Sequence, residues 1–201
     1  LSPIRRVVGS EPVLTPELLA VARAVADRYA GVLGDVLRLA VPKRHAAAER
    51  ALPAAGASLP PVPAPEPGPW AAYPAGEAFL RRIVAGEAPA ASWLALPGQG
   101  AGSDWPRAFA VAAASALHAG RGVVLVVPDH RDVDRVDAAL RAELGPGRHV
   151  RLTADQGPQA RYTAWLKLLR GHVRCVVGTR AAAFAPVREP ALLAWWDDGD
   201  D

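Results

Sequence analysis

A glycine-rich turn carries the residues of this sequence that are best suited to bind a phosphate group. It reads PGQGAGSD over residues 97–104, between an apolar run and an apolar helical segment, and its candidate residues are Gly98, Gly100, Gly102, Ser103 and Asp104. Glycine lets the backbone approach a ligand closely, and the N–H groups at the start of a helix attract an anion. The turn is therefore the first candidate site for a nucleotide.

The turn departs from a phosphate-binding P-loop at both positions that do chemistry. The pattern G-x-x-x-x-G-K-[ST] aligns Pro97 and Gly102 with the two glycines, Ser103 with the lysine and Asp104 with the hydroxyl residue. Without the lysine, no ammonium group reaches the β- and γ-phosphates, and the aspartate carboxylate repels them. We expect a loop that keeps its shape and lacks its catalytic groups.

Two other interpretations of the same turn stay open. Gly98, Gly100 and Ser103 approximate the dinucleotide pattern G-x-G-x-x-[GA], with Asp129 as the acid for a ribose hydroxyl, although Asp129 lies further on than the usual ~20 residues. That interpretation implies an NAD(P)-dependent, Rossmann-type oxidoreductase. Alternatively, the segment is a tight strand-to-helix turn that is capped by Ser103 or Asp104.

Four more candidate residues follow apolar runs nearer the C-terminus. Asp197 and Asp198 come after a run that ends in two tryptophans. Their carboxylates could hold Mg²⁺, as in an ATPase, or could simply belong to a solvated turn. Thr179 and Arg180 follow a glycine and place a hydroxyl beside a guanidinium, a pair suited to a DNA phosphate.

The elements that must position these candidates alternate along residues 71–201. Short apolar runs rich in Val and Leu are separated by helical segments of ten or more residues. Continuous apolar strands with helical crossovers indicate a parallel sheet, so we predict an α/β fold with ligands at the carboxyl ends of the strands. The predicted strands span 92–96, 123–127, 149–152, 173–177 and 191–196, and the predicted helices span 76–86, 106–118, 131–143 and 158–170.

The first 70 residues have a different character. Residues 5–8 are a short strand candidate, Thr15 can cap a helix, and 35–41 can form a second short helix. Residues 1–42 hold too little apolar surface to fold alone, so we expect them to be the tail of a domain that lies upstream. Seven prolines within 43–70 predict an extended spacer with nothing to bury.

Composition narrows the classes of protein. The chain has 201 residues, a formal net charge of +3 and only two lysines, Lys43 and Lys167, so its charge is a weak indication of an anionic partner. No apolar run of about 20 residues is free of charge and proline, which argues against a membrane-spanning helix. The lone Cys175 excludes a cysteine-based metal site and suits a reducing cytoplasm. Because the sequence contains no methionine, we expect it to be a fragment.

Two stretches together resemble a known family, the primosomal replication-restart (PriA) proteins. The run RRVVGSEPVLTPELL at 5–19, with Tyr29 and LGDVL at 33–37, resembles the end of that family's DNA 3′-end-binding domain. The run VVGTRAAAFAP at 176–186, with AWL at 164–166, is similar to its first helicase lobe, where G-T-R-[SA]-x-x-F-x-P precedes an acidic D-E-x-H motif. Both stretches occur in the order found in the family.

The resemblance implies three parts. Residues 1–42 would be the C-terminal end of a small β-rich 3′-DNA-end-binding domain, 43–70 a linker, and 71–201 a RecA-like lobe of a superfamily 2 helicase, truncated at its acidic motif. In the ancestral family the lobe uses ATP and Mg²⁺, and zinc is held in a module outside this chain. The implied partners are forked or single-stranded DNA, primosome proteins and single-strand-binding proteins, with no membrane, in the cytoplasm at the nucleoid.

The chain also departs from the family at its catalytic positions. Ser103 and Asp104 replace the Lys and Thr of the phosphate loop, residues 197–200 match the acidic motif only in part, and a winged-helix domain is missing. This pattern is similar to the actinobacterial branch, whose members are described as lacking helicase activity. We therefore expect a DNA-binding restart protein with lost ATPase and helicase activity, and we assign it no cofactor. An active ATP-dependent 3′-5′ helicase, with Arg107 or another arginine in the role of the lysine, stays the alternative beside the oxidoreductase.

Overall fold

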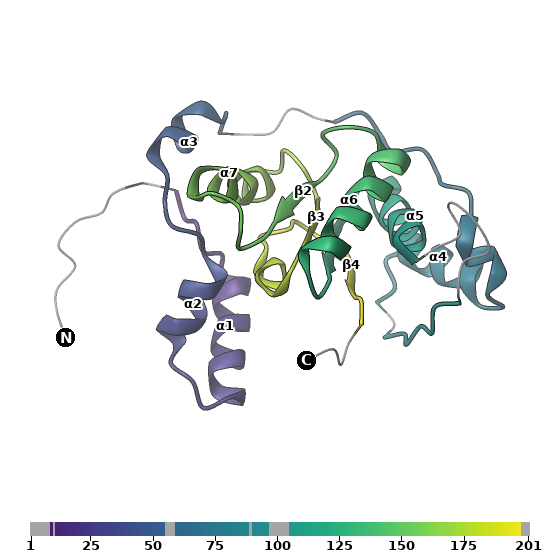
Figure 1. Cartoon of the computed structure of the whole chain (residues 1–201), viewed down its shortest axis with the longest axis horizontal. Helices are drawn as coiled ribbons and strands as arrows, with labels where there is room; N and C mark the ends of the chain where they lie inside the picture. The colour runs from purple at the N-terminus through teal and green to yellow at the C-terminus, as the bar shows by residue number, and fades with distance from the viewer. Residues whose placement is uncertain (1–8, 10, 55–58, 89, 97–104, 198–201) are drawn as a thin grey trace.

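A parallel β-sheet with helices on both faces forms the body of the protein in the computed structural model (Figure 1). The structure describes residues 9, 11–54, 59–88, 90–96 and 105–197. Four strands pair in the order β2-β3-β1-β4, and every pair is parallel. They are β1 (Gly122–Val126), β2 (Val150–Leu152), β3 (Cys175–Gly178) and β4 (Pro190–Trp195). The predicted α/β class is confirmed.

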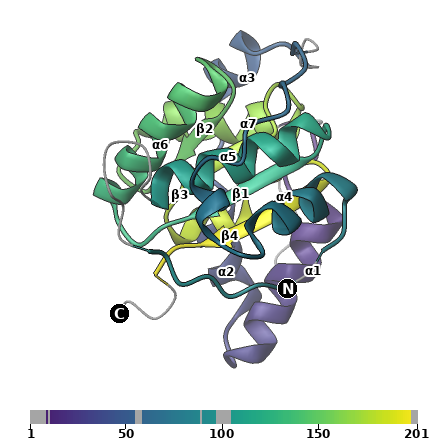
Figure 2. The ribbon, with the colours of Figure 1, turned by 90° about the vertical axis from the view of Figure 1, so that its right-hand side faces the viewer.

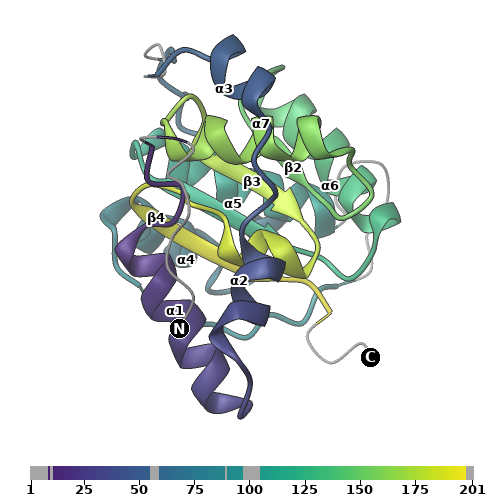
Figure 3. The same cartoon turned by 90° about the vertical axis from the view of Figure 1, so that its left-hand side faces the viewer.

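The two faces of the sheet carry separate cores. Figure 2 looks onto the face with α5 (Trp105–His118) and α6 (His130–Leu144), where α4 (Gly76–Ala85) packs on α5. Figure 3 looks onto the opposite face, with α7 (Pro158–Leu169) and the 3-10 helix η2 (Arg180–Phe184). In β1, Val123 and Leu125 enter the first core, and Val124 and Val126 enter the second. Because both sides of the strand are buried, its sequence is apolar without alternation.

Two helices precede the lobe, as the sequence predicts. They are α1 (Pro16–Arg28) and α2 (Leu33–Ala40), and Figure 3 shows them below the sheet. The hydroxyl of Thr15 accepts a hydrogen bond from Leu18 N at 3.3 Å, which confirms the predicted N-cap. The strand candidate at 5–8 lies outside the described residues.

The prediction of a strand at 92–96 is wrong. These residues have no regular secondary structure, and Leu94 is 87% exposed. Within the described chain no strand pairs with them, and the N–H of Leu96 instead donates to the Tyr73 hydroxyl at 2.8 Å. A short apolar run becomes a strand only where a neighbouring strand takes its backbone hydrogen bonds.

The segment at 43–70 is more ordered than the prediction of a bare spacer. It contains α3 (Ala46–Ala51) and runs into the 3-10 helix η1 (Gly68–Ala72). Ala48 is 2% exposed because it packs on α7. Further along, the carbonyl of Pro60 accepts a hydrogen bond from Arg148, and that of Val62 is hydrogen-bonded to His118. The described part of this segment therefore makes contacts with the lobe over much of its length.

Candidate nucleic-acid interface

The carboxyl edge of the sheet gathers the residues that follow each strand. Val126, at the end of β1, is in register with Gly178 of β3 on one side and with Trp195 of β4 on the other. Arg180 therefore leaves the sheet on one side of β1, and Asp197 leaves it on the other. The fold brings these two sequence-predicted residues to the same edge.

An aromatic stack occupies the start of α5, directly after the glycine-rich turn. The turn itself, with Gly98, Gly100, Gly102, Ser103 and Asp104, lies outside the described residues. Trp105, the first residue of α5, is 9% exposed, and its ring stacks on Trp196 with centroids 4.0 Å apart and planes 7° from parallel. The guanidinium of Arg135 lies 5.2 Å from the centre of the Trp105 ring. The packed indoles of Trp105 and Trp196 therefore lie at the start of α5. In a P-loop protein this is the first turn of the helix that follows the loop lysine.

The stack belongs to a larger aromatic cluster that sequence reasoning missed. The Trp93 ring lies 4.8 Å from Trp70 and 6.0 Å from both Phe109 and Trp196, and the Trp70 indole N–H donates to Ala108 O at 2.8 Å. Each such aromatic pair adds about 0.5–1.5 kcal/mol beyond its buried area. The cluster fixes the end of β4 against α5. The only signal in the sequence is the number of tryptophans, because their spacing has no period.

Asp129, the residue of the dinucleotide interpretation, has a structural role. Its carboxylate caps α6 and accepts hydrogen bonds from Arg131 N at 2.8 Å and Asp132 N at 2.9 Å. These bonds, that from Asp132 first, lower the pKa of Asp129. The sequence contains the signal for this cap, an aspartate before a helix with an acid in its first turn.

Thr179 and Arg180 stand at the start of η2. Thr179 is the residue before the helix, and its carbonyl accepts the N–H of Ala182 at 2.7 Å. Arg180 is exposed, and no carboxylate of the described chain lies within ion-pair distance of it. Gly178 must be glycine, because a Cβ there would collide with the carbonyl of Leu152 on β2. The turn thus presents an available guanidinium to solvent.

The acidic end of the chain is described only in part. Asp197 is exposed and has a φ of 55°, in the left-handed region that aspartate tolerates better than most residues, and Asp198 lies outside the described residues. Among the described residues no three His, Cys, Asp or Glu side chains gather as a metal site would need. Cys175 is buried in β3, and burial raises the pKa of its thiol to about 12.

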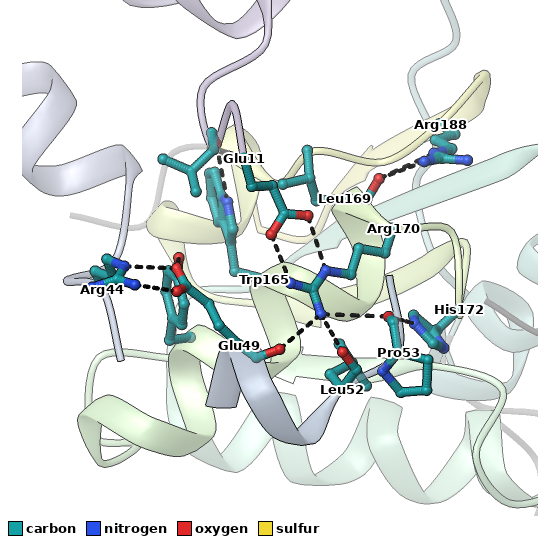
Figure 4. Close-up of polar contacts among 12 residues, drawn as sticks. Glu11, Arg44, Glu49, Leu52, Pro53, Trp165, Leu169, Arg170, His172 and Arg188 are labelled. Atoms are coloured by element: carbon teal, nitrogen blue, oxygen red, sulfur yellow. Dashed lines mark hydrogen bonds and ion pairs between the residues drawn. The ribbon is translucent and has the colours of Figure 1, made fainter. Parts of the chain in front are cut away.

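A buried arginine at the end of α7 ties the N-terminal segment to the lobe (Figure 4). The side chain of Arg170 is 8% exposed and forms a two-pronged ion pair with Glu11, with N···O distances of 2.9 and 2.7 Å. It also donates to the carbonyls of Glu49, Leu52 and Pro53. One guanidinium therefore joins the segment before α1, the end of α3 and the lobe.

Neighbouring side chains reinforce this junction. The indole N–H of Trp165 donates to Val13 O at 3.2 Å, and the hydroxyl of Tyr162 donates to Glu49 at 2.6 Å. Hydrogen bonds from Arg44 and then from Tyr162 lower the pKa of Glu49, while burial is the main cause that raises the pKa of Tyr162. Sequence reasoning missed the junction, since a basic residue in the last turn of a helix is typical and gives no hint of a partner 159 positions away.

Comparison with known proteins identifies the family. A model of the PriA 3′ DNA-binding domain (3′BD) matches residues 1–42. The chain is 48% identical over 197 residues to a probable replication restart protein PriA of Mycobacterium tuberculosis (strain CDC 1551 / Oshkosh), which covers 98% of the chain and 29% of that protein. It is 46% identical over 198 residues to the protein of the same name from Mycobacterium leprae (strain TN), covering 98% of the chain and 30% of the relative.

A more distant relative supports the same assignment. The probable replication restart protein PriA of Deinococcus radiodurans is 34% identical over 96 residues, which cover 47% of this chain and 10% of that protein. The chain spans about three tenths of the length of its mycobacterial relatives. Within the described residues, no helix has both the length and the apolar character needed to cross a membrane. The family resemblance expected from the sequence is confirmed, and the chain belongs to the PriA replication restart proteins.

Proposed function

We propose that this chain is the part of a replication restart protein that joins a 3′-end-binding DNA module to a RecA-like lobe without ATPase or helicase activity. Residues 1–42 end the DNA module, 43–70 connect the two parts, and 71–201 form the lobe. In this proposal the lobe is a scaffold that binds forked or single-stranded DNA, while primosome and single-strand-binding proteins assemble on the whole protein. The cytoplasm, at the nucleoid, is the compartment that suits this role and the buried Cys175, which forms no disulfide in the described chain.

The match of residues 1–42 to a 3′ DNA-binding domain is the observation that carries the DNA-binding part of the proposal. The geometry of the lobe adds support. Arg180 is exposed at the carboxyl edge of the sheet, and α2, in the matched segment, packs against η2, which begins with Arg180. A guanidinium at that place can continue a path of DNA phosphates from the module onto the lobe.

The sequence of the phosphate loop supports the loss of hydrolysis. Ser103 and Asp104 stand where an ATPase needs an ammonium group and a Mg²⁺-binding hydroxyl. The packing just beyond the loop agrees, because the buried Trp105 stacks there on the partly buried Trp196. Losing the lysine and the metal ligand together removes most of the charge stabilisation of the transferred phosphoryl group.

The alternative of an active helicase needs another cation in the loop. Arg107 is two residues inside α5, and its guanidinium carbon would lie 3.8 Å from a Cβ at Gly68 of η1. The guanidinium of Arg107 thus lies close to Gly68 of η1. Nucleotide titration of the full-length protein separates the two proposals, since only the active helicase needs tight ATP binding.

The DNA contact is tested by replacing Arg180 with alanine in the full-length protein. A lost phosphate contact weakens binding to forked DNA of any sequence and lowers the slope of log affinity against log salt by about 1. Arg81, an exposed arginine on α4, is the matched control, and Arg81→Ala should leave affinity and slope unchanged. Equal behaviour of the two variants would contradict the assignment of Arg180.

A further inference from the structure

Trp195 differs from every other tryptophan of the chain. The aromatic cluster contains four of the others, Trp70, Trp93, Trp105 and Trp196. Trp165, on α7, is buried in the core between α7 and the sheet. Trp195 is 50% exposed at the end of β4 and has no ring contact or hydrogen bond among the described residues. Half of a large apolar ring is thus held in solvent on a rigid strand.

Strand register fixes the face on which the Trp195 ring lies. Leu193 and Trp195 are in register with Val124 and Val126 of β1, and residues in register on neighbouring strands point to the same face. Val124 and Val126 face the core that includes Ala182 of η2. The Trp195 ring therefore lies on the η2 side of the sheet, and Trp196 points to the opposite side, into the aromatic cluster.

The same register places Trp195 across β1 from Arg180. Val126 of β1 pairs with Gly178 on one side and Trp195 on the other, so two strand spacings, roughly 10 Å, separate Trp195 from the turn that carries Arg180. At this separation one single strand of nucleic acid can contact both groups. A base would lie on the exposed ring, and a neighbouring phosphate would lie on the exposed guanidinium. Helix α2 packs on η2 and lies on the same face (Figure 3).

We propose that Trp195 is a stacking platform for one base of single-stranded DNA whose backbone passes over Arg180. The proposal rests on the proposed function, because it extends the Arg180 contact by a second subsite. A base can stack on the open ring face without a hydrogen-bonding partner, so the subsite is tolerant of sequence. Asp197, two residues further on, repels phosphate, which favours a base over Trp195 and directs the backbone toward Arg180.

The test measures binding of a single-stranded oligothymidylate to the full-length protein and its variants. Trp195→Ala should weaken binding roughly 5- to 100-fold, the usual range for one lost base stack, and Trp195→Phe should restore most of the affinity. Leu193→Ala is the matched control, because Leu193 is 52% exposed on the same face of the same strand and has no ring. An oligonucleotide of abasic spacers should bind the parent and Trp195→Ala equally.

Three results would overturn the proposal. If Trp195→Ala binds the oligothymidylate like the parent while Arg180→Ala binds it weakly, the subsite is wrong and the proposed function stands. If Trp195→Ala and Leu193→Ala lose affinity equally, this face is covered by protein and not by a base. If the parent protein binds no single-stranded or forked DNA, both the subsite and the proposed function fail.

Discussion

Single residues decide what the carboxyl edge of the sheet can do. Trp105 follows the loop in which Ser103 stands at the lysine position and Asp104 at the hydroxyl position, and its ring stacks on Trp196 at 4.0 Å, with the guanidinium of Arg135 5.2 Å from the ring centre. A nucleotide phosphate needs open N–H groups and a cation at such a place. Arg180, by contrast, is exposed beside an open turn. At the residue scale these side chains support the proposal that the edge contacts a nucleic-acid backbone and does not hydrolyse ATP.

His149 is a second residue whose environment has a measurable consequence. Its side chain is 4% exposed, its Nε2 lies 2.9 Å from Asp137, and its Nδ1 has no partner in the described chain. Burial lowers the pKa of His149, and the hydrogen bond to Asp137 only partly opposes this effect. The imidazole of His149 is therefore protonated less readily in the folded protein than in the unfolded chain.

The pKa shift of His149 predicts a pH dependence of stability. Because the folded pKa lies below the ordinary value of about 6.5, the unfolded state binds more protons as the pH falls past 6.5. The free energy of unfolding of the 201-residue chain should thus be nearly constant between about pH 7 and 8, below the range in which the unfolded Cys175 ionises, and decrease from pH 6.5 downward. His149→Gln should flatten this decrease in urea titrations between pH 5.5 and 7.5, whereas His130→Gln, at an exposed position, should not. If the free energy of unfolding of the parent protein instead rises as the pH falls from 7.5 to 5.5, the lowered pKa of His149 is contradicted.

At the scale of elements, hydrophobic pattern predicts most of the lobe. The run at 123–127 and residues 175–177 of the predicted strand at 173–177 are apolar on both faces because helices cover both sides of the sheet, and the sequence shows this directly. The run at 92–96 looks the same and forms no strand, since pairing depends on a neighbour that no local pattern specifies. The contacts of α3 with α7 were equally hidden, because they join segments more than 100 positions apart.

The junction at Arg170 makes a prediction about how the N-terminal segment docks. Arg170→Ala leaves Glu11 and three backbone carbonyls without their donor in a largely buried place. Breaking a buried ion pair costs about 3–5 kcal/mol, and the partial exposure of Glu11 puts the expected loss near the lower end, at about 3 kcal/mol. Chemical denaturation of the 201-residue chain measures this loss.

Arg188 provides the matched control for Arg170. It is exposed and donates two hydrogen bonds to the carbonyl of Leu169, next to Arg170 in the sequence. Arg188→Ala should therefore cost about 1 kcal/mol or less. In hydrogen exchange, Arg170→Ala should also increase exchange in α3, where Leu52 N donates to Ala48 O. Equal small losses for both variants would show that Arg170 does not hold the segments together.

At the scale of the whole molecule, residues 46–53 connect two parts that the sequence separates, the segment at 1–42 and the lobe at 71–201. The family match ends at residue 42, yet residues 46–53 pack on α7 through Ala48, Leu52 and the bonds of Arg170. The sequence predicts a proline spacer here because proline density is a local property. The helix that precedes the prolines is short, so it depends on its contact with α7 in addition to its N-cap His45 and the pair between Arg44 and Glu49. This arrangement supports a scaffold that holds its DNA module at a fixed position.

The most direct test of the central proposal measures DNA binding and ATP hydrolysis on the same preparation of full-length protein. We predict that forked DNA binds and that phosphate release from ATP stays at the background rate with saturating DNA. As a positive control, a family member with an intact phosphate-loop lysine should release phosphate under the same conditions. DNA-stimulated phosphate release by this protein would contradict the proposed loss of activity, and its disappearance in Asp197→Asn would place the hydrolytic site at the acidic end of β4.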